Sequence, residues 1–160
     1  MAGAAAGPLT SAPCKVRRNG VRAKRERRAW GGVDDPVSAF FGIYNLQDAS
    51  AVYDIFSTDY VGTINGKRVK GPDEARLFFE EFLKAFPDCM FAVEDRVEDG
   101  SGIIAARWWF EASHDGEWLG HAASGRRVTS AGMTFFHVRQ GRIFRLWGMW
   151  DVAGLLAQIS

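Results

Sequence analysis

Residues 141–160 read GRIFRLWGMWDVAGLLAQIS, and this stretch does most to decide the fold. The turn residues Gln140 and Gly141 precede it, and a predicted strand rich in aromatic residues ends at Trp150. Asp151 follows that strand directly and stands before a short apolar helix. A lone carboxylate after an aromatic strand is an unusual place for charge. The pattern therefore marks Asp151 as a candidate for the mouth of a pocket.

Three further strands are predicted before this one, at Met90–Val97, Gly102–Ser113 and Arg127–Arg139. Each is rich in β-branched and aromatic residues, and turns that contain glycine separate them. This spacing predicts an antiparallel meander of four strands that ends with Arg142–Trp150. A brief extended piece is also expected at 59–62.

The first part of the chain shows helical patterns instead. Asp35 and Pro36 suit the cap and first position of a helix, and apolar residues recur at helical spacing from Val37 to Tyr44. Asp48 can cap a short second helix, and a third, with the most regular apolar stripe, runs from Gly71 to Phe86. Helices followed by strands predict an α+β fold, in which a curved antiparallel sheet wraps around three N-terminal helices.

Charge divides the chain into two parts. Residues 1–33 carry eight Lys or Arg and one acid, whereas the remaining residues carry 12 basic and 18 acidic side chains. We predict one domain over 34–160 and a disordered basic segment over 1–33. The composition of this segment resembles a transit peptide, which would place the protein in the chloroplast; the alternative is a plain tail on a cytoplasmic protein.

Other partners and cofactors are not indicated. A nucleic-acid-binding arm is disfavoured because the basic segment lacks interleaved aromatic residues and the rest of the chain is acidic. The sequence contains no run of 18 apolar residues for a membrane span. Two cysteines and three histidines show no metal-binding spacing, and no motif calls for a cofactor.

A family resemblance extends over residues 36–159. It rests on the order of short motifs such as Tyr44-Asn45, Gly71-Pro72-Asp73, Gly141-Arg142-Ile143 and Trp147-x-x-x-Asp151. The chain resembles the SnoaL-like polyketide cyclases of the nuclear transport factor 2-like and ketosteroid isomerase-like superfamily. The resemblance implies a conical cavity that binds a small, mostly apolar molecule. It also implies a pocket carboxylate that moves a proton beside a carbonyl group.

The chain departs from that chemistry at two positions. Aligned on the Gly141-Arg142-Ile143 motif, the catalytic Asp of the antibiotic cyclases falls on Gly148, and their pocket His falls on Thr134. Neither residue can act as an acid or base. Two hypotheses remain: a domain that binds a small apolar ligand, with or without cyclase- or isomerase-like proton transfer, or a non-catalytic dimerisation or protein-interaction module of the same fold.

Asp151 and His114 are the candidate catalytic residues. Asp151 is a general base if its pocket removes it from water, and a helix cap if its carboxylate accepts backbone hydrogen bonds. His114 lies in a predicted turn, where most histidines are simply solvated; His121 and His137 likewise show no partner in the sequence.

Seven residues are candidates for ligand binding, because aromatic walls with a few polar groups are typical of such sites. They are Tyr44, Tyr60, Arg107, Trp108, Thr134, Phe136 and Trp150. Arg107 interrupts an apolar strand, so it either pairs with Glu111 or Glu94 or holds an anionic substrate.

Aromatic residues also occur at successive positions of the predicted strands, as at Trp108-Trp109 and Phe135-Phe136. Successive side chains point to opposite faces of a sheet, so both faces carry large apolar groups. Such a surface usually marks a partner. We therefore expect a homodimer formed through the sheet.

Overall fold

Helix α1 (Pro36–Asn45) begins at the predicted Asp-Pro pair in the computed structural model, which describes residues 35–160. The Asp35 carboxylate accepts hydrogen bonds from the backbone N–H groups of Val37 and Ser38, at 3.2 and 3.3 Å. These two donors have no carbonyl partner within the helix, so the side chain satisfies them. The predicted cap is confirmed.

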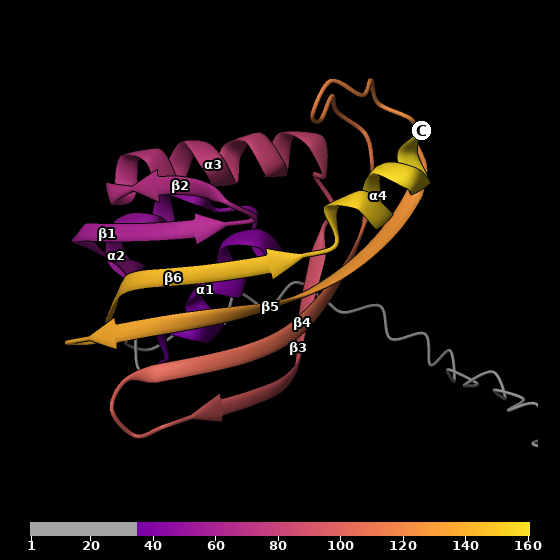
Figure 1. Cartoon of the computed structure of the whole chain (residues 1–160). Helices are drawn as coiled ribbons and strands as arrows, with labels where there is room; N and C mark the ends of the chain where they lie inside the picture. Colours follow the sequence, from indigo (N-terminus) through magenta and orange to yellow (C-terminus); the bar gives the residue numbers. More distant parts are fainter. Residues whose placement is uncertain (1–34) are drawn as a thin grey trace, which may run out of the picture.

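The other elements follow in chain order (Figure 1). The helical elements are η1 (Ala49–Ala51), α2 (Val52–Ile55), α3 (Gly71–Ala85) and α4 (Val152–Ile159). The strands are β1 (Phe56–Ile64), β2 (Lys67–Lys70), β3 (Met90–Glu98), β4 (Ile103–Ser113), β5 (Arg127–Arg139) and β6 (Arg142–Trp150). Helices followed by strands confirm the predicted α+β class.

The strands form one sheet in the order β2-β1-β6-β5-β4-β3. Strands β3 to β6 form the predicted antiparallel meander. Two expectations are corrected. The extended piece expected at 59–62 is the nine-residue strand β1, which pairs with a strand β2 that was not predicted. The sheet is also mixed, because β1 runs parallel to β6.

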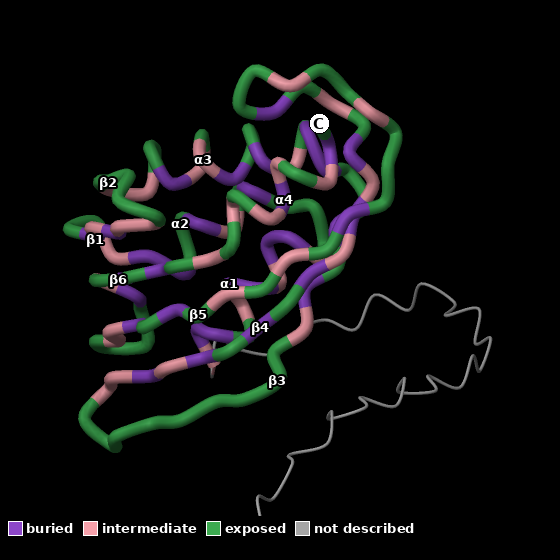
Figure 2. Tube along the Cα trace, turned by 45° about the vertical axis from the view of Figure 1, so that its right-hand side comes forward, coloured by how far each residue is buried: buried purple, intermediate pink, exposed green. Residues whose placement is uncertain are grey.

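The two faces of the sheet differ in burial, as the alternation of colours along the strands in Figure 2 shows. In β5, Thr134 and Phe136 are buried on the inner face, whereas Phe135 is half exposed on the outer face. Helices α1 and α3 cover the inner face: the ring centroid of Phe40 lies 5.0 Å from that of Phe136, and Phe82 lies 5.5 Å from Phe110. The predicted packing of helices against one face is therefore confirmed.

The loop 114–126 between β4 and β5 folds back over the end of α3. Its residues Asp115 and Gly116 donate backbone hydrogen bonds to the carbonyl oxygen of Ala85. Trp118 from this loop is buried, with its ring centroid 5.6 Å from that of Trp150. The loop therefore closes one end of the space between the sheet and the helices, namely the end at which β6 terminates.

The predicted basic segment over 1–33, with its transit-peptide interpretation, lies outside the described residues. Within residues 35–160, no helix is long and apolar enough to cross a membrane. In the same part of the chain, no three His, Cys, Asp or Glu side chains come together as a metal site would require.

Candidate functional site

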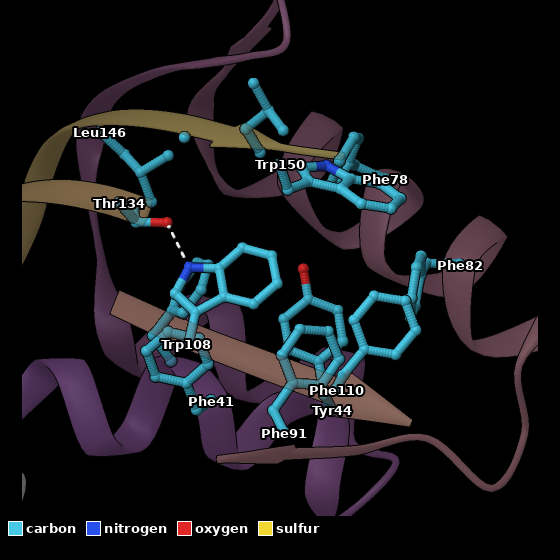
Figure 3. Close-up of a pocket in the computed structure, with 13 residues that line it drawn as sticks. Phe41, Tyr44, Phe78, Phe82, Phe91, Trp108, Phe110, Thr134, Leu146 and Trp150 are labelled. Atoms are coloured by element: carbon cyan, nitrogen blue, oxygen red, sulfur yellow. Dashed lines mark hydrogen bonds between the residues drawn. The ribbon is translucent and has the colours of Figure 1, made fainter. Parts of the chain in front are cut away.

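A cavity lies between the inner face of the sheet and helices α1 and α3 (Figure 3). Nine of its thirteen lining residues are aromatic, and none carries a formal charge. The lining residues are Phe40, Phe41, Tyr44, Ile64, Phe78, Phe82, Phe91, Trp108, Phe110, Thr134, Leu146, Gly148 and Trp150. Such a surface favours flat, apolar molecules.

The cavity is narrow. The void is about 440 Å³ when the open solvent at its mouth is included. Only about 30 Å³ of it can hold the centre of a water molecule. That space suits two or three waters. Ile64, Phe78 and Trp150 are the lining residues that are only partly buried, so they mark the open side. A larger molecule therefore needs some of the lining side chains to move.

Helix α1 places the hydroxyl of Tyr44 in this space. The Asn45 side chain exchanges hydrogen bonds with the backbone N–H and carbonyl of Phe91, at 2.7 and 3.0 Å, and so fixes the end of α1 against β3. The Tyr44 ring stacks on Phe91 with centroids 4.1 Å apart. Figure 3 shows its hydroxyl pointing into the space between Trp108 and Phe82. Burial raises the pKa of the Tyr44 phenol, so the group stays neutral and protonated.

Thr134 and Gly148, which the sequence resemblance aligns with the pocket His and the catalytic Asp of antibiotic cyclases, lie on the neighbouring strands β5 and β6. Thr134 and Gly148 are direct cross-strand partners, and both line the cavity. The Thr134 hydroxyl accepts a hydrogen bond of 2.9 Å from the indole N–H of Trp108. An added Cβ atom at Gly148 would make only ordinary contacts, the nearest at 3.5 Å from the Thr134 hydroxyl oxygen. The two residues at which the sequence departs from the antibiotic cyclases therefore both line the cavity.

The structure brings four of the seven predicted ligand-binding residues to the cavity, namely Tyr44, Trp108, Thr134 and Trp150. Tyr60 and Phe136 are buried in the core but do not line it. Both belong to the same aromatic core, since Tyr60 packs on Phe56 and Phe136 on Phe40.

Arg107 lies on the outer face of the sheet, away from the cavity. Its guanidinium contacts the carboxylates of Glu94 and Asp95, with 2.7 Å between Nε and an Asp95 oxygen. Of the two partners expected from the sequence, Glu94 is present, whereas Glu111 pairs with Arg127 instead. Half of the Arg107 side chain is exposed.

His114 is fully buried, which corrects the expectation of a solvated turn. The loop 114–126 folds back so that the imidazole packs on Phe86, with centroids 5.4 Å apart. Its Nδ1 lies 3.2 Å from the backbone N–H of Ser124, and Nε2 has no partner among residues 35–160. His114 is not a lining residue. His121 belongs to the same loop, and His137 lies on the outer face against Trp147.

Asp151 caps helix α4. Its carboxylate accepts a hydrogen bond of 2.7 Å from the backbone N–H of Gly154, and the residue is exposed. It is not among the residues that line the cavity. Of its two interpretations, the geometry shows the cap.

The cap predicts a small and specific effect on stability. Asp151→Ala removes the acceptor and is expected to lower the free energy of unfolding by about 1 kcal/mol. Asp151→Asn keeps a capping oxygen and is expected to change it by less than about 0.5 kcal/mol. Denaturant unfolding of both variants checks this. Equal losses for Ala and Asn would contradict the cap.

Several lining residues were predicted only as core residues. Phe40, Phe41, Phe78 and Phe82 belong to the apolar stripes of α1 and α3, so the helical period places them on the right face. The sequence holds no signal that tells which residues of such a stripe border a void, because that depends on the distance between helix and sheet.

Comparison with known proteins places the chain in a family. Residues 37–159 match the family model described as SnoaL-like polyketide cyclase. No curated protein matches the chain in sequence.

Solved structures show the same fold. A SnoaL-like polyketide cyclase from Agrobacterium tumefaciens is 23% identical with a TM-score of 0.65, and the match covers 80% of this chain and 98% of that one. TsrD from Streptomyces laurentii is 23% identical with a TM-score of 0.70, covering 78% and 92%. AclR from Streptomyces galilaeus, assigned as a hydroxylase, is 25% identical with a TM-score of 0.69, covering 78% of each chain. On the family match over nearly all of its described residues, the chain belongs to the SnoaL-like polyketide cyclase family.

Proposed function

We propose that this domain binds a small, flat, mostly apolar molecule in the aromatic cavity. The observation that carries the proposal is the lining itself, which has nine aromatic side chains and no charged one. Burial of apolar ligand surface there is favourable by roughly 25 cal/mol per Å². Aromatic rings also stack on one another with a specific geometry, which favours flat ligands over chain-like ones.

The lining supports binding more than proton transfer. An acid-base step needs a group within hydrogen-bond reach of the ligand that can take up and return a proton near neutral pH. Gly148 and Thr134 cannot do so, and Tyr44 holds its proton because burial raises its pKa. Asp151 and His114 lie outside the set of lining residues. Proton transfer by this cavity would therefore need a base from elsewhere.

The proposal can be tested by nuclear magnetic resonance with indane, a flat bicyclic hydrocarbon. The indole N–H signals of Trp108 and Trp150 report on the cavity, and those of Trp109 and Trp147, on the outer face, serve as internal controls. We expect saturable shifts at the first pair and none at the second. No saturable shift, or shifts only at Trp109 and Trp147, would overturn the proposal.

The outer face of the sheet favours a second function, which is the homodimer predicted from the sequence. Phe135 and Trp147 are cross-strand partners on β5 and β6, as are Met133 and Met149. These four side chains are 47 to 65% exposed and form one outer-face patch. A patch of this kind is usually covered by a partner. We propose that a second copy of the chain covers it.

Trp147→Glu tests the dimer. A charge at the centre of the patch is expected to raise the dimer dissociation constant at least about 100-fold, because it would be buried without a partner. Sedimentation velocity at micromolar concentration measures the change. Leu77→Glu is the matched control, since Leu77 is 58% exposed on α3 and lies outside the patch. A wild-type protein that sediments only as a monomer would contradict the proposal.

A further inference from the structure

We propose that residues 117–123, the tip of loop 114–126, form a lid over the Trp150 side of the cavity. A ligand enters and leaves when the turn at this tip opens and the Trp118 ring moves out of its place. This inference rests on the proposed function, because the lid controls access to the same cavity. It adds a route of entry and the residues that set its rate.

One buried side chain attaches the tip to the rest of the domain. Of the thirteen residues in loop 114–126, only His114 and Trp118 are buried, and the colours of the loop between β4 and β5 in Figure 2 show the others as exposed or half-buried. The hydrogen bonds of the tip join Trp118 to His121, and none reaches another part of residues 35–160. Burial of the Trp118 ring is therefore what holds the tip in place.

The base of the loop is held more firmly than the tip. The backbone N–H of His114 donates to the carbonyl oxygen of Arg126 at 3.0 Å, and the His114 carbonyl accepts a hydrogen bond from Gly125 at 2.9 Å. The His114 Nδ1 accepts a third from the backbone N–H of Ser124, at 3.2 Å. The start of the loop is also hydrogen-bonded to the end of α3. The tip can therefore open while the base stays on the domain.

The Trp118 ring lies behind the wall of the cavity. Its centroid is 5.6 Å from that of Trp150 and 6.5 Å from that of Phe82, and both of these residues line the cavity, whereas Trp118 does not. Trp150 also lies 6.0 Å from Phe110 and 6.3 Å from Phe82, so three rings surround it. Close packing of this kind leaves the Trp150 indole little room to turn. Departure of Trp118, the one ring that a loop carries, gives it that room and widens the narrow cavity.

The turn at the tip contains a residue that does not favour its backbone conformation. Trp118 and His121 exchange two backbone hydrogen bonds of 2.9 Å, and Leu119 and Gly120 between them have φ angles of 48° and 82°. Positive φ at both positions is typical of a type I′ turn, for which Asn-Gly is the preferred pair. Leucine is strained at positive φ, and the side chain of Leu119 gains little from burial because it is 56% exposed. Opening of the turn releases this strain and frees Trp118.

Two other turns of the chain share this backbone conformation. Residues 65–66 join β1 to β2 and are Asn-Gly, with φ angles of 45° and 82°. Residues 140–141 join β5 to β6 and are Gln-Gly, with φ angles of 52° and 72°. Both of these turns connect paired strands of the sheet, whereas the turn at 119–120 lies in a tip that one ring holds. Strain in so weakly attached a segment lowers the free energy of opening it.

Leu119→Asn tests the lid without changing the lining of the cavity. It creates the preferred Asn-Gly turn, so the lid is expected to open more rarely. Because entry and exit both need the open lid, the association and dissociation rate constants of indane are each expected to fall about fivefold, while Kd stays within about twofold. Trp118→Ala removes the ring that holds the lid and is expected to raise both rate constants at least about tenfold.

The rate constants are measured from the line shape of the Trp108 indole signal during a titration with indane, and thermal unfolding shows whether each variant is folded. Hydrogen exchange of the His121 amide, which is bonded to Trp118 across the turn, reports on opening of the lid itself. This exchange is expected to slow about fivefold in Leu119→Asn. If Trp118→Ala does not fold, Leu119→Asn alone decides the test.

Gln140→Asn is the matched control, because it makes the same kind of change in a turn of the same conformation between β5 and β6. It is expected to leave both rate constants within about twofold of the wild-type values. If indane binds but Leu119→Asn leaves its rate constants or the exchange of the His121 amide unchanged, the lid is overturned and the binding function stands. Equal effects of Leu119→Asn and Gln140→Asn would also overturn the lid. If indane does not bind, the proposed function fails and the lid fails with it.

Discussion

Phe136→Ala is expected to lower the free energy of unfolding by about 3 to 5 kcal/mol, a large share of the roughly 5 to 15 kcal/mol that stabilises a typical domain. Phe136 is fully buried on the inner face of β5. Its ring lies 5.0 Å from Phe40 and 6.2 Å from Phe41, so it joins the middle of the sheet to α1. Truncation would leave a void that neither a rigid strand nor a helix can fill.

Phe135→Ala is the matched control for this prediction. Phe135 is the same residue type in the adjacent position of the same strand, but its side chain is 50% exposed on the outer face. Its truncation is expected to change the free energy of unfolding by less than about 1 kcal/mol when the protein is monomeric. Guanidinium unfolding at low protein concentration measures both variants. Similar losses would show that the inner and outer faces have been assigned the wrong way round.

The helices could be predicted from the sequence because their determinants are local. The Asp35 cap and the apolar stripe of α1 lie within ten residues of one another, and the apolar stripe of α3 lies within a single helix of 15 residues. The long strands β3 to β6 were predicted for a similar reason. Each pairs with the next one along the chain, and the turns between several of them contain glycine.

Strand β1 could not be predicted at its full length because its partner is distant in the sequence. It pairs in parallel with β6, and the Asn65 side chain extends this pairing by hydrogen bonds of 3.0 Å to both backbone groups of Trp150. The residues of β1 include Asp59 and Gly62, which have low strand propensity. Pairing with β6 overrides that local preference. The local pattern gave only a short extended piece.

The structure brings four of the seven predicted ligand-binding residues to the cavity, and the reasons why others lie elsewhere differ. Successive strand residues alternate in direction, so Trp108 on the inner face places Arg107 on the outer face. The sequence shows that the two residues point in opposite directions but not which of them points inward. His114 differs in kind: its burial depends on how the loop 114–126 folds over Phe86, which no period in the sequence encodes.

Gly148→Leu is expected to abolish binding of indane, with a dissociation constant at least about 100-fold higher than in the wild-type protein. Gly148 is buried, lines the cavity and has only ordinary contacts around an added Cβ atom, at 3.5 Å from the Thr134 oxygen and 3.6 Å from Ile64. A leucine side chain would extend from there into the void that the ligand needs. Because the narrow cavity has little room beyond the Cβ atom, the free energy of unfolding is expected to fall by about 1 to 3 kcal/mol.

Gly148→Ala provides the matched control. A single methyl group fits without displacing a neighbour, so this variant is expected to bind indane within about threefold of the wild-type protein. Nuclear magnetic resonance titration of the Trp108 indole signal, with thermal unfolding alongside, measures both variants. If Gly148→Leu is folded and still binds indane with wild-type affinity, the ligand occupies another site. In that case Gly148 would have no part in forming the binding cavity. The absence of a base at this position, which the sequence aligns with the cyclase Asp, would then say nothing about the chemistry of this protein.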